Sequence, residues 1–172
     1  MDRPADNLEG RPQGAAGVAE VARIISRAGL VEAFGHVSAR SGDGFLITPT
    51  RPLGKTSESD VLELDAHGQP VREADDVPLE APLHAAVYAA REDVGAVVRT
   101  DAPAAVAAGA DGAVPPLVHG LGGLAGEVAI CDRIDLVADA EAGRQVADAL
   151  GPASNLLLRG NGSFSVGTGL AE

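Results

Sequence analysis

Short apolar runs, each a few residues long and bounded by Gly, Pro or charge, limit most strongly how this chain can fold. Runs of this length fit buried strands and are far shorter than the roughly 18 residues that cross a membrane. They fall at Val61–Leu64, Ala96–Val98, Val128–Cys131, Leu156–Leu158 and Ser163–Val166. Segments with helical spacing separate them, at 15–30, 80–90, 102–110 and 141–150. This alternation predicts an α/β fold with a mixed or antiparallel sheet.

The first strands are expected to form a hairpin. His36–Ser41 and Phe45–Thr48 flank a turn that contains Gly42 and Gly44, which is a hairpin signal. Residues 1–14 are polar and broken by Pro and Gly, so we expect a flexible lead-in. The 172 residues fit one compact domain, which we place at 15–172.

Charge and cysteine usage exclude several classes of function. The formal net charge is −12, so phosphate backbones and anionic membranes would repel the chain. We therefore expect neither a nucleic-acid nor a membrane partner. The lone Cys131 can form neither an internal disulfide nor a thiolate metal cluster, which favours the cytoplasm. The only lysine, Lys55, lies among Gly, Pro and Ser, and we expect it at the surface rather than in Schiff-base chemistry.

One glycine-rich segment resembles a nucleotide-binding motif but lacks the flanking strand and helix that this motif requires. Gly120–Ala125 fits a loose G-x-G-x-x-G/A pattern, but prolines precede it and a strand-like run follows. The dinucleotide motif needs a strand before it and a helix after it. We interpret the segment as a loop that passes close to other backbone.

Polar residues cluster at the ends of the apolar runs. Glu80 and His84 are four residues apart, so on a helix they share one face. Arg99 and Asp101 follow the run Ala96–Val98 and would project to the same side of an extended segment. Two further polar residues are Asn161, in a Gly-Asn-Gly turn, and His36, at the start of the hairpin. Each alone has a structural explanation, such as a buried histidine or a surface pair worth under about 1 kcal/mol.

Taken together, five segments resemble one known family. They are Gly35–Arg40, Leu46–Thr50, Pro78–Tyr88, Asp93–Val98 and Leu156–Gly162, collinear over about residues 15–168. Their order and spacing resemble the class II aldolase/adducin family. The resemblance implies an α/β/α sandwich around a mainly antiparallel central sheet. It also implies a four-fold homotetramer with sites between subunits, and a divalent metal, often Zn²⁺, that polarises a carbonyl.

The sequence departs from this family at its metal site. The three metal-binding histidines are replaced, because Arg99-Thr100-Asp101 stands for His-x-His and Asn161-Gly162 for His-Gly. The acidic residue is retained as Glu80. His36 replaces an Asn, and Arg51 replaces the Gly after Thr50. Pro78-Leu79 replaces a Ser-Ser pair that helps to hold a substrate phosphate.

The replaced residues favour a site without metal. Arg99 would place a permanent cation where the family keeps imidazole, and it could hold a carboxylate or enolate by two hydrogen bonds. Should a cation bind instead, Glu80, Asp101 and Asn161 offer only oxygen ligands, which suit Mg²⁺, Ca²⁺ or Mn²⁺ better than Zn²⁺.

The leading hypothesis is a divergent enzyme on the class II aldolase scaffold. It would carry out lyase or isomerase chemistry on a small, non-phosphorylated carbonyl or carboxylate compound, as a homotetramer and without a cofactor. The expected catalytic residues are Glu80, His84 and His36, and the expected substrate-binding residues are Arg99, Asp101, Asn161, Thr50 and Arg51. One alternative is a non-catalytic, adducin-like scaffold. Another is a metal-dependent lyase or oxygenase that uses Glu80, Asp101 and His119.

Overall fold

The structure, a computed structural model, describes residues 13–172. The predicted lead-in, residues 1–14, lies outside the described residues except for its last two, and the first helix already begins at Gly14. The single domain over residues 15–172 stays a prediction. Among the described residues, no helix is both long and apolar enough to cross a membrane.

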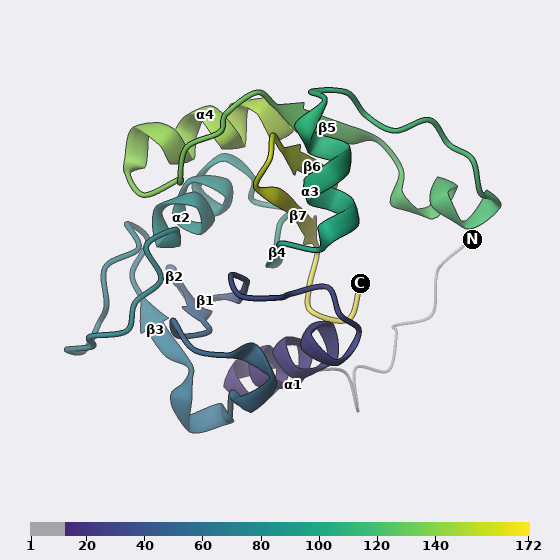
Figure 1. The fold of residues 1–172 in the computed structure, drawn as a ribbon. Helices are drawn as coiled ribbons and strands as arrows, with labels where there is room; N and C mark the ends of the chain where they lie inside the picture. Colours follow the sequence, from purple (N-terminus) through teal and green to yellow (C-terminus); the bar gives the residue numbers. More distant parts are fainter. Residues whose placement is uncertain (1–12) are drawn as a thin grey trace, which may run out of the picture.

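A seven-stranded sheet forms the centre of the molecule, in the order β3-β2-β1-β4-β7-β6-β5 (Figure 1). All neighbouring strands are antiparallel except β5 and β6, which are parallel. The predicted α/β fold with a mainly antiparallel sheet is therefore confirmed. The strands are β1 His36–Ser41, β2 Gly44–Ile47, β3 Leu62–Leu64, β4 Ala96–Thr100, β5 Val128–Cys131, β6 Asn155–Leu158 and β7 Gly162–Gly167.

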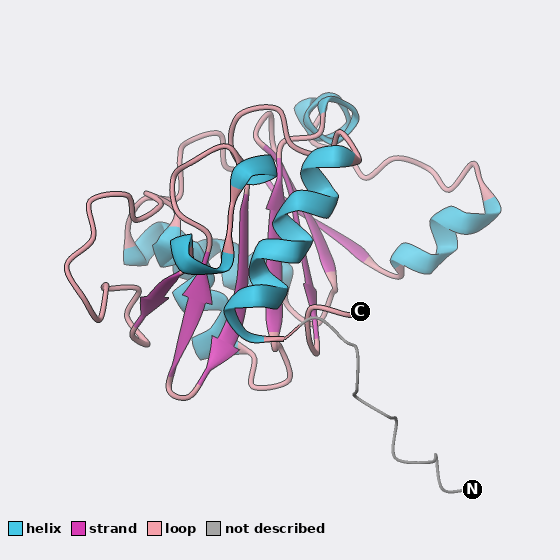
Figure 2. Cartoon of the chain, turned by 90° about the horizontal axis from the view of Figure 1, so that it is seen from below, coloured by secondary structure: helices cyan, strands magenta, loops and turns pink. Residues whose placement is uncertain are grey.

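Helices cover both faces of the sheet. On one face, α2 and α4 pack over a core that includes Phe45, Val97 and Phe164. On the other face, α1 packs on β1 and α3 packs on β6 and β7, and Figure 2 shows α1 in front of the strands. The helices are α1 Gly14–Arg27, α2 Ala81–Ala90, α3 Pro103–Ala110 and α4 Ala140–Leu150, with short 3₁₀ helices η1 Leu53–Lys55, η2 Glu58–Asp60 and η3 Gly120–Ala125.

The period of two along β1 divides its side chains between the two layers. Val37 and Ala39 are buried against α1 in an apolar cluster. His36 and Ser38 point to the opposite face, where α2 lies. The hairpin that the sequence predicts thus delivers two polar side chains to the interface between β1 and α2.

Residues 111–127 form an exposed arm that projects from the body beside α3 (Figure 1). The arm includes η3, where the sequence had predicted a loop close to other backbone. That prediction is wrong at Gly120, because a Cβ atom added there would meet nothing within 4 Å. The segment forms a 3₁₀ helix at the surface, and its last residue, Ala125, accepts a hydrogen bond from the side chain of Asn155 on β6.

Candidate active site

The centre of the candidate site is a buried ion pair between a strand and a helix. Glu80 stands at the N-cap of α2, and Arg99 lies within β4 on the side that faces α2. Arg99 Nε is 3.1 Å from Glu80 Oε2, and the two side chains are only 1% and 3% exposed. The N–H at Nε has no hydrogen-bond partner, so this contact is a charge–charge interaction. The guanidinium thus compensates the negative charge of a carboxylate, which would be strongly unfavourable in a buried place without a partner.

Two further groups hold the Arg99 guanidinium. Nη2 donates to Oδ1 of Asn161 at 2.7 Å, and Nη1 donates to the carbonyl of Phe34 at 2.8 Å. Asn161 reaches Arg99 because the turn before β7 runs against β4. Gly162 in that turn has φ +97°, and a Cβ there would lie 2.2 Å from the Thr100 carbonyl. Only glycine permits this approach, so the Gly-Asn-Gly sequence positions the amide.

His36 lies beside the ion pair. It is the strand partner of Arg99 in the β1–β4 ladder, and its Nδ1 is 4.0 Å from Glu80 Oε2. Burial lowers the pKa of His36 to about 4, and the positive charge of Arg99 acts in the same direction. His36 is therefore a neutral imidazole at pH 7, with a buried Nδ1 that has no hydrogen-bond partner.

His84 lies one helical turn beyond Glu80 and is fully buried. Its ring contacts that of His36 edge to face, with 5.7 Å between the ring centres. Burial lowers the pKa of His84 well below its ordinary value, and His36 and Arg99 lower it further. Its Nδ1 is 2.7 Å from the hydroxyl of Ser38, which in turn is 2.8 Å from that of Tyr88.

Sequence reasoning missed Ser38 and Tyr88, although their spacing could have revealed them. Ser38 is two residues after His36, so both share one face of β1. Tyr88 is four residues after His84, so both share one face of α2.

Asp101 contacts a different part of the chain. Its carboxylate accepts hydrogen bonds from the backbone N–H groups of Glu32, Ala33 and Phe34 at 2.9–3.1 Å. The sequence predicts a contact of Arg99 with Asp101 or with Glu80, and the structure forms the one with Glu80. Asp101 anchors the segment whose Phe34 carbonyl touches Arg99. These backbone bonds lower the pKa of Asp101 against the opposing effect of its partial burial, which is the largest single influence.

The cluster of side chains around the ion pair consists of Glu80, Arg99, Asn161, His36 and His84. Thr50 and Arg51 have their partners outside this cluster. The backbone N–H of Thr50 donates to the carbonyl of Asp76. Arg51 forms ion pairs with Asp60 at 2.9 Å and with Asp76 at 2.8 Å. Their roles in substrate binding stay predictions.

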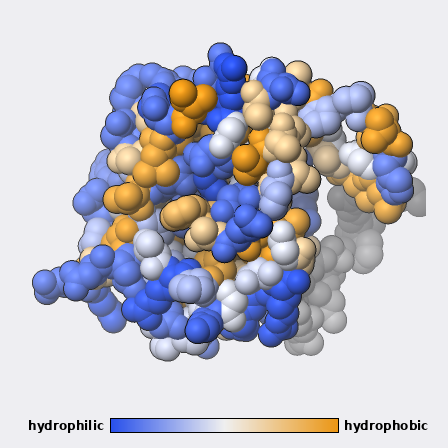
Figure 3. All heavy atoms as spheres, in the orientation of Figure 1, coloured by the Kyte–Doolittle hydropathy of each residue, from blue (hydrophilic) through white to orange (hydrophobic). Residues whose placement is uncertain are grey.

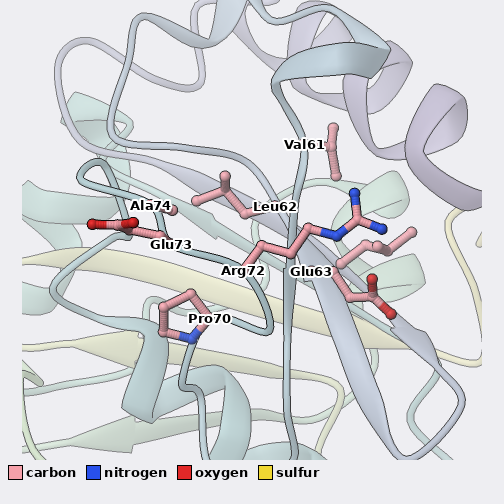
Figure 4. Close-up of a pocket in the computed structure, with 8 residues that line it drawn as sticks. Val61, Leu62, Glu63, Pro70, Arg72, Glu73 and Ala74 are labelled. Carbon is pink, nitrogen blue, oxygen red and sulfur yellow. The ribbon is translucent and has the colours of Figure 1, made fainter.

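The remaining candidates lie on exposed surfaces. His119 is on the arm, where its Nδ1 accepts from the backbone N–H of Leu121, and no contact among the described residues joins it to Glu80. Lys55 is exposed. A hollow of about 340 Å³ lies at the edge strand β3, where Figure 4 shows Arg72 extending toward Val61 and Glu63. Its lining contains no residue of the cluster.

The residues present do not fit the divalent metal that the family resemblance implies. A guanidinium lies against Glu80 and takes the oxygen of Asn161, so neither group is free for a cation. The carboxylate of Asp101 is occupied by three backbone N–H groups. Within residues 13–172, no three His, Cys, Asp or Glu side chains lie close enough to hold a metal ion.

The cluster combines a cation, a carboxylate and two neutral imidazoles in a desolvated place. A guanidinium there can bind a carboxylate or an enolate oxygen through charge-assisted hydrogen bonds. A carboxylate beside it can accept and return a proton. The arrangement therefore suits reactions in which negative charge develops on an oxygen.

Comparisons with known proteins identify the family of the chain. The model of the class II aldolase and adducin N-terminal domain matches residues 16–172. The 3,4-dihydroxyphthalate decarboxylase of Arthrobacter keyseri is 31% identical over 165 residues, which cover 86% of this chain and 66% of that protein. The 5-methylthioribulose-1-phosphate/5-deoxyribulose-1-phosphate aldolase of Rhodospirillum rubrum is 33% identical over 112 residues, covering 64% of this chain and 50% of that one. The chain thus spans between half and two thirds of the length of these curated relatives.

A solved structure gives the same result for the fold. The L-fuculose-1-phosphate aldolase of Thermus thermophilus superposes with a TM-score of 0.73 at 29% identity. The superposition covers 88% of this chain and 77% of that one.

Proposed function

The chain belongs to the class II aldolase and adducin family, and we propose that it is a lyase acting on a small, non-phosphorylated carbonyl or carboxylate compound. The proposed reaction breaks a carbon–carbon bond next to a carbonyl or carboxylate group. Its relatives include a decarboxylase and aldolases. Both reactions leave an electron pair on carbon that is stabilised as an enolate, so one site chemistry serves both.

The buried Arg99–Glu80 pair is the observation that carries this proposal. Arg99 is 1% exposed and has its guanidinium held by Glu80, Asn161 and a backbone carbonyl. A cation held by Glu80 and Asn161 is preorganised for negative charge that develops once substrate is bound. We therefore assign to Arg99 the electrostatic role that a metal plays elsewhere in the family.

The proposed reaction consists of substrate binding, carbon–carbon cleavage and protonation of the product carbon. A substrate oxygen first replaces the Phe34 carbonyl on Arg99, which requires the segment over the guanidinium to move. In an aldol cleavage, Glu80 then takes the proton of the substrate hydroxyl as the carbon–carbon bond breaks, and the electron pair moves onto the enolate oxygen at Arg99. Glu80 returns its proton to the carbon. Asn161 orients Arg99, while His36 and His84 act as orienting or proton-transfer groups.

A non-catalytic scaffold is the second candidate, and the burial of the ion pair favours it. Glu80 and Arg99 are at most 3% exposed. In a scaffold, the role of this pair would be purely structural, namely to hold α2 against β4. The two candidates differ in whether a small anion reaches Arg99.

The exposed arm supports a homotetramer, which the family resemblance implies. Five of its large apolar side chains are 45–88% exposed, namely Val114, Leu117, Val118, Leu121 and Leu124, and Figure 3 shows hydrophobic atoms on the projecting arm. Apolar surface of this kind marks an interaction site. The free Cys131 supports a reducing compartment, and we propose the cytoplasm.

Activity against a panel of substrates tests the proposal. The panel contains hydroxy-carboxylates, dihydroxylated aromatic carboxylates and their phosphorylated counterparts, with products followed by NMR. We expect carbon–carbon cleavage of a non-phosphorylated compound, lowered about a hundredfold in kcat/KM by Arg99→Lys or Glu80→Gln. Arg144→Gln, at an exposed pair with Glu141, is the control and should retain activity. No turnover together with no anion binding at Arg99 would favour the scaffold.

A further inference from the structure

A ladder of polar contacts crosses the interface between β1 and α2. Ser38 on β1 lies between His84 and Tyr88, which occupy successive turns of α2. Ser38 and His84 have no solvent exposure and Tyr88 has 6%. The surroundings are apolar, with Phe45 stacked on the His84 ring at 6.3 Å between centres. Most buried polar groups in such a place are hydrogen-bonded, and Ser38 supplies the partner of both His84 Nδ1 and Tyr88.

The direction of the hydrogen bonds follows from the donors available at Tyr88. Burial raises the pKa of Tyr88 far above its ordinary value, so the phenol keeps its proton. Ser38 Oγ, 2.8 Å away, is the hydrogen-bond partner that the described residues offer to this phenol. Ser38 is then the acceptor for the phenol proton. Ser38 has one proton of its own, and it can donate that proton to Nδ1 of His84.

A neutral imidazole has one protonated nitrogen and one bare nitrogen. His84 is neutral at pH 7, because burial holds its pKa well below the ordinary value. When Nδ1 accepts from Ser38, the proton of the ring lies on Nε2. This Nε2 is buried and has no hydrogen-bond partner, although the ring contacts that of His36 beside the Glu80–Arg99 pair.

We propose that Ser38 and Tyr88 are positioning residues that fix His84 in the tautomer protonated on Nε2, so that the ring presents an unused hydrogen-bond donor next to the Glu80–Arg99 pair. The tautomer is a property of the folded protein and does not depend on activity. Use of the Nε2–H to bind a substrate oxygen rests on the proposed function. A buried donor without a partner is unfavourable, and a substrate oxygen would supply the missing partner.

The ¹⁵N signals of the histidine rings test the tautomer directly. Long-range ¹H–¹⁵N spectra of protein labelled at its four histidines separate protonated from bare ring nitrogens, and variants lacking single histidines assign them. For His84 at pH 7 we expect a protonated Nε2 and an Nδ1 at the position of a hydrogen-bond acceptor. A protonated Nδ1 in the wild-type protein would overturn the proposal, whatever the variants do.

Three variants separate positioning from packing. Ser38→Ala should move the His84 Nδ1 signal to that of an imidazole nitrogen without a donor, and Tyr88→Phe should move it less in the same direction. Ser38→Thr restores the hydroxyl and should return the signal. The control Thr48→Val removes a buried hydroxyl that accepts from Val37 and should leave His84 unchanged. An unchanged Nδ1 signal in Ser38→Ala would overturn the proposal, whereas absence of lyase activity would leave all these spectra as expected.

Discussion

At the residue scale, Arg99 determines what the site can do. A strand places it opposite Glu80, the N-cap residue of α2, and a turn supplies the amide of Asn161. Three elements therefore meet at one guanidinium. The Arg99–Glu80 pair stabilises the fold only while both partners are present, because removing one of them leaves the other as an unpaired buried charge.

Replacement of Arg99 by a metal-binding side chain tests this dependence. We expect Arg99→His to lower the free energy of unfolding by about 3–5 kcal/mol, the scale for breaking a buried pair. Added Zn²⁺ should restore part of the loss, because the new imidazole and the carboxylate of Glu80 are both groups that bind zinc in proteins. Urea titrations with and without Zn²⁺ measure both effects.

The control for this experiment is the exposed ion pair of Arg51 with Asp60. Arg51→His should change stability by less than about 1 kcal/mol, since exposed pairs contribute little. Wild-type protein should contain no stoichiometric transition metal by elemental analysis, and a chelator should not change its melting temperature. One equivalent of tightly bound metal in the wild-type protein would contradict the metal-free site and favour Glu80 and Asp101 as ligands.

The buried histidines predict a loss of stability in weak acid. Both have a native pKa below the ordinary 6.5, that of His36 being about 4. Between these values the unfolded chain binds more protons than the native protein, so stability falls as pH decreases from about 6.5 toward 4. His36 alone contributes about 3 kcal/mol over this window.

Urea titrations at a series of pH values measure this dependence. His36→Asn should reduce the slope between pH 6.5 and 4 and leave the part due to His84. The exposed His67→Asn is the control and should retain the full slope. A wild-type stability that stays constant over this range would show that the imidazoles are not held neutral.

At the scale of elements, Asp101 links two distant parts of the chain. It lies just after β4 and holds the backbone of residues 32–34, which precede β1. The same segment supplies the carbonyl that contacts Arg99. Asp101 therefore controls how tightly this segment covers the ion pair.

Hydrogen exchange tests that control. Asp101→Ala should speed amide exchange at Glu32, Ala33 and Phe34 by at least tenfold, because each N–H loses its acceptor. The matched variant Asp132→Ala breaks an exposed pair with Arg159 and should leave these three amides unchanged. Equal exchange in the Asp101→Ala and wild-type proteins would mean that other contacts hold the segment.

The sequence allowed prediction of those contacts that depend on local spacing or on the order of motifs. These include the hairpin that begins with His36–Ser41, the helix that follows Glu80, and the contact of Glu80 with Arg99. The partners of Asp101 could not be predicted, because the backbone N–H groups that donate to it lie 67–69 residues away and backbone groups leave no side-chain signature. The arm was also missed, since its apolar residues face solvent rather than the core.

At the scale of the whole molecule, charge and apolar surface are separated. The chain has a net charge of −12, whereas residues 112–126 of the arm contain no Asp, Glu, Lys or Arg. Copies of an anionic protein repel each other over most of their surfaces. An uncharged apolar arm is where this repulsion is weakest and where burial of apolar surface is most favourable.

We therefore expect the arm to be required for assembly. Light scattering at micromolar concentration should give about 69 kDa, which is four times the chain mass of 17.2 kDa. Leu117→Asp with Leu121→Asp should lower this mass toward that of one chain, because burial of two carboxylates in an apolar contact is strongly unfavourable. Val71→Asp alters another exposed apolar residue, away from the arm, and should leave the assembly intact. A wild-type mass of about 17 kDa would contradict the tetramer, and an unaffected tetramer in the double variant would place its interface elsewhere.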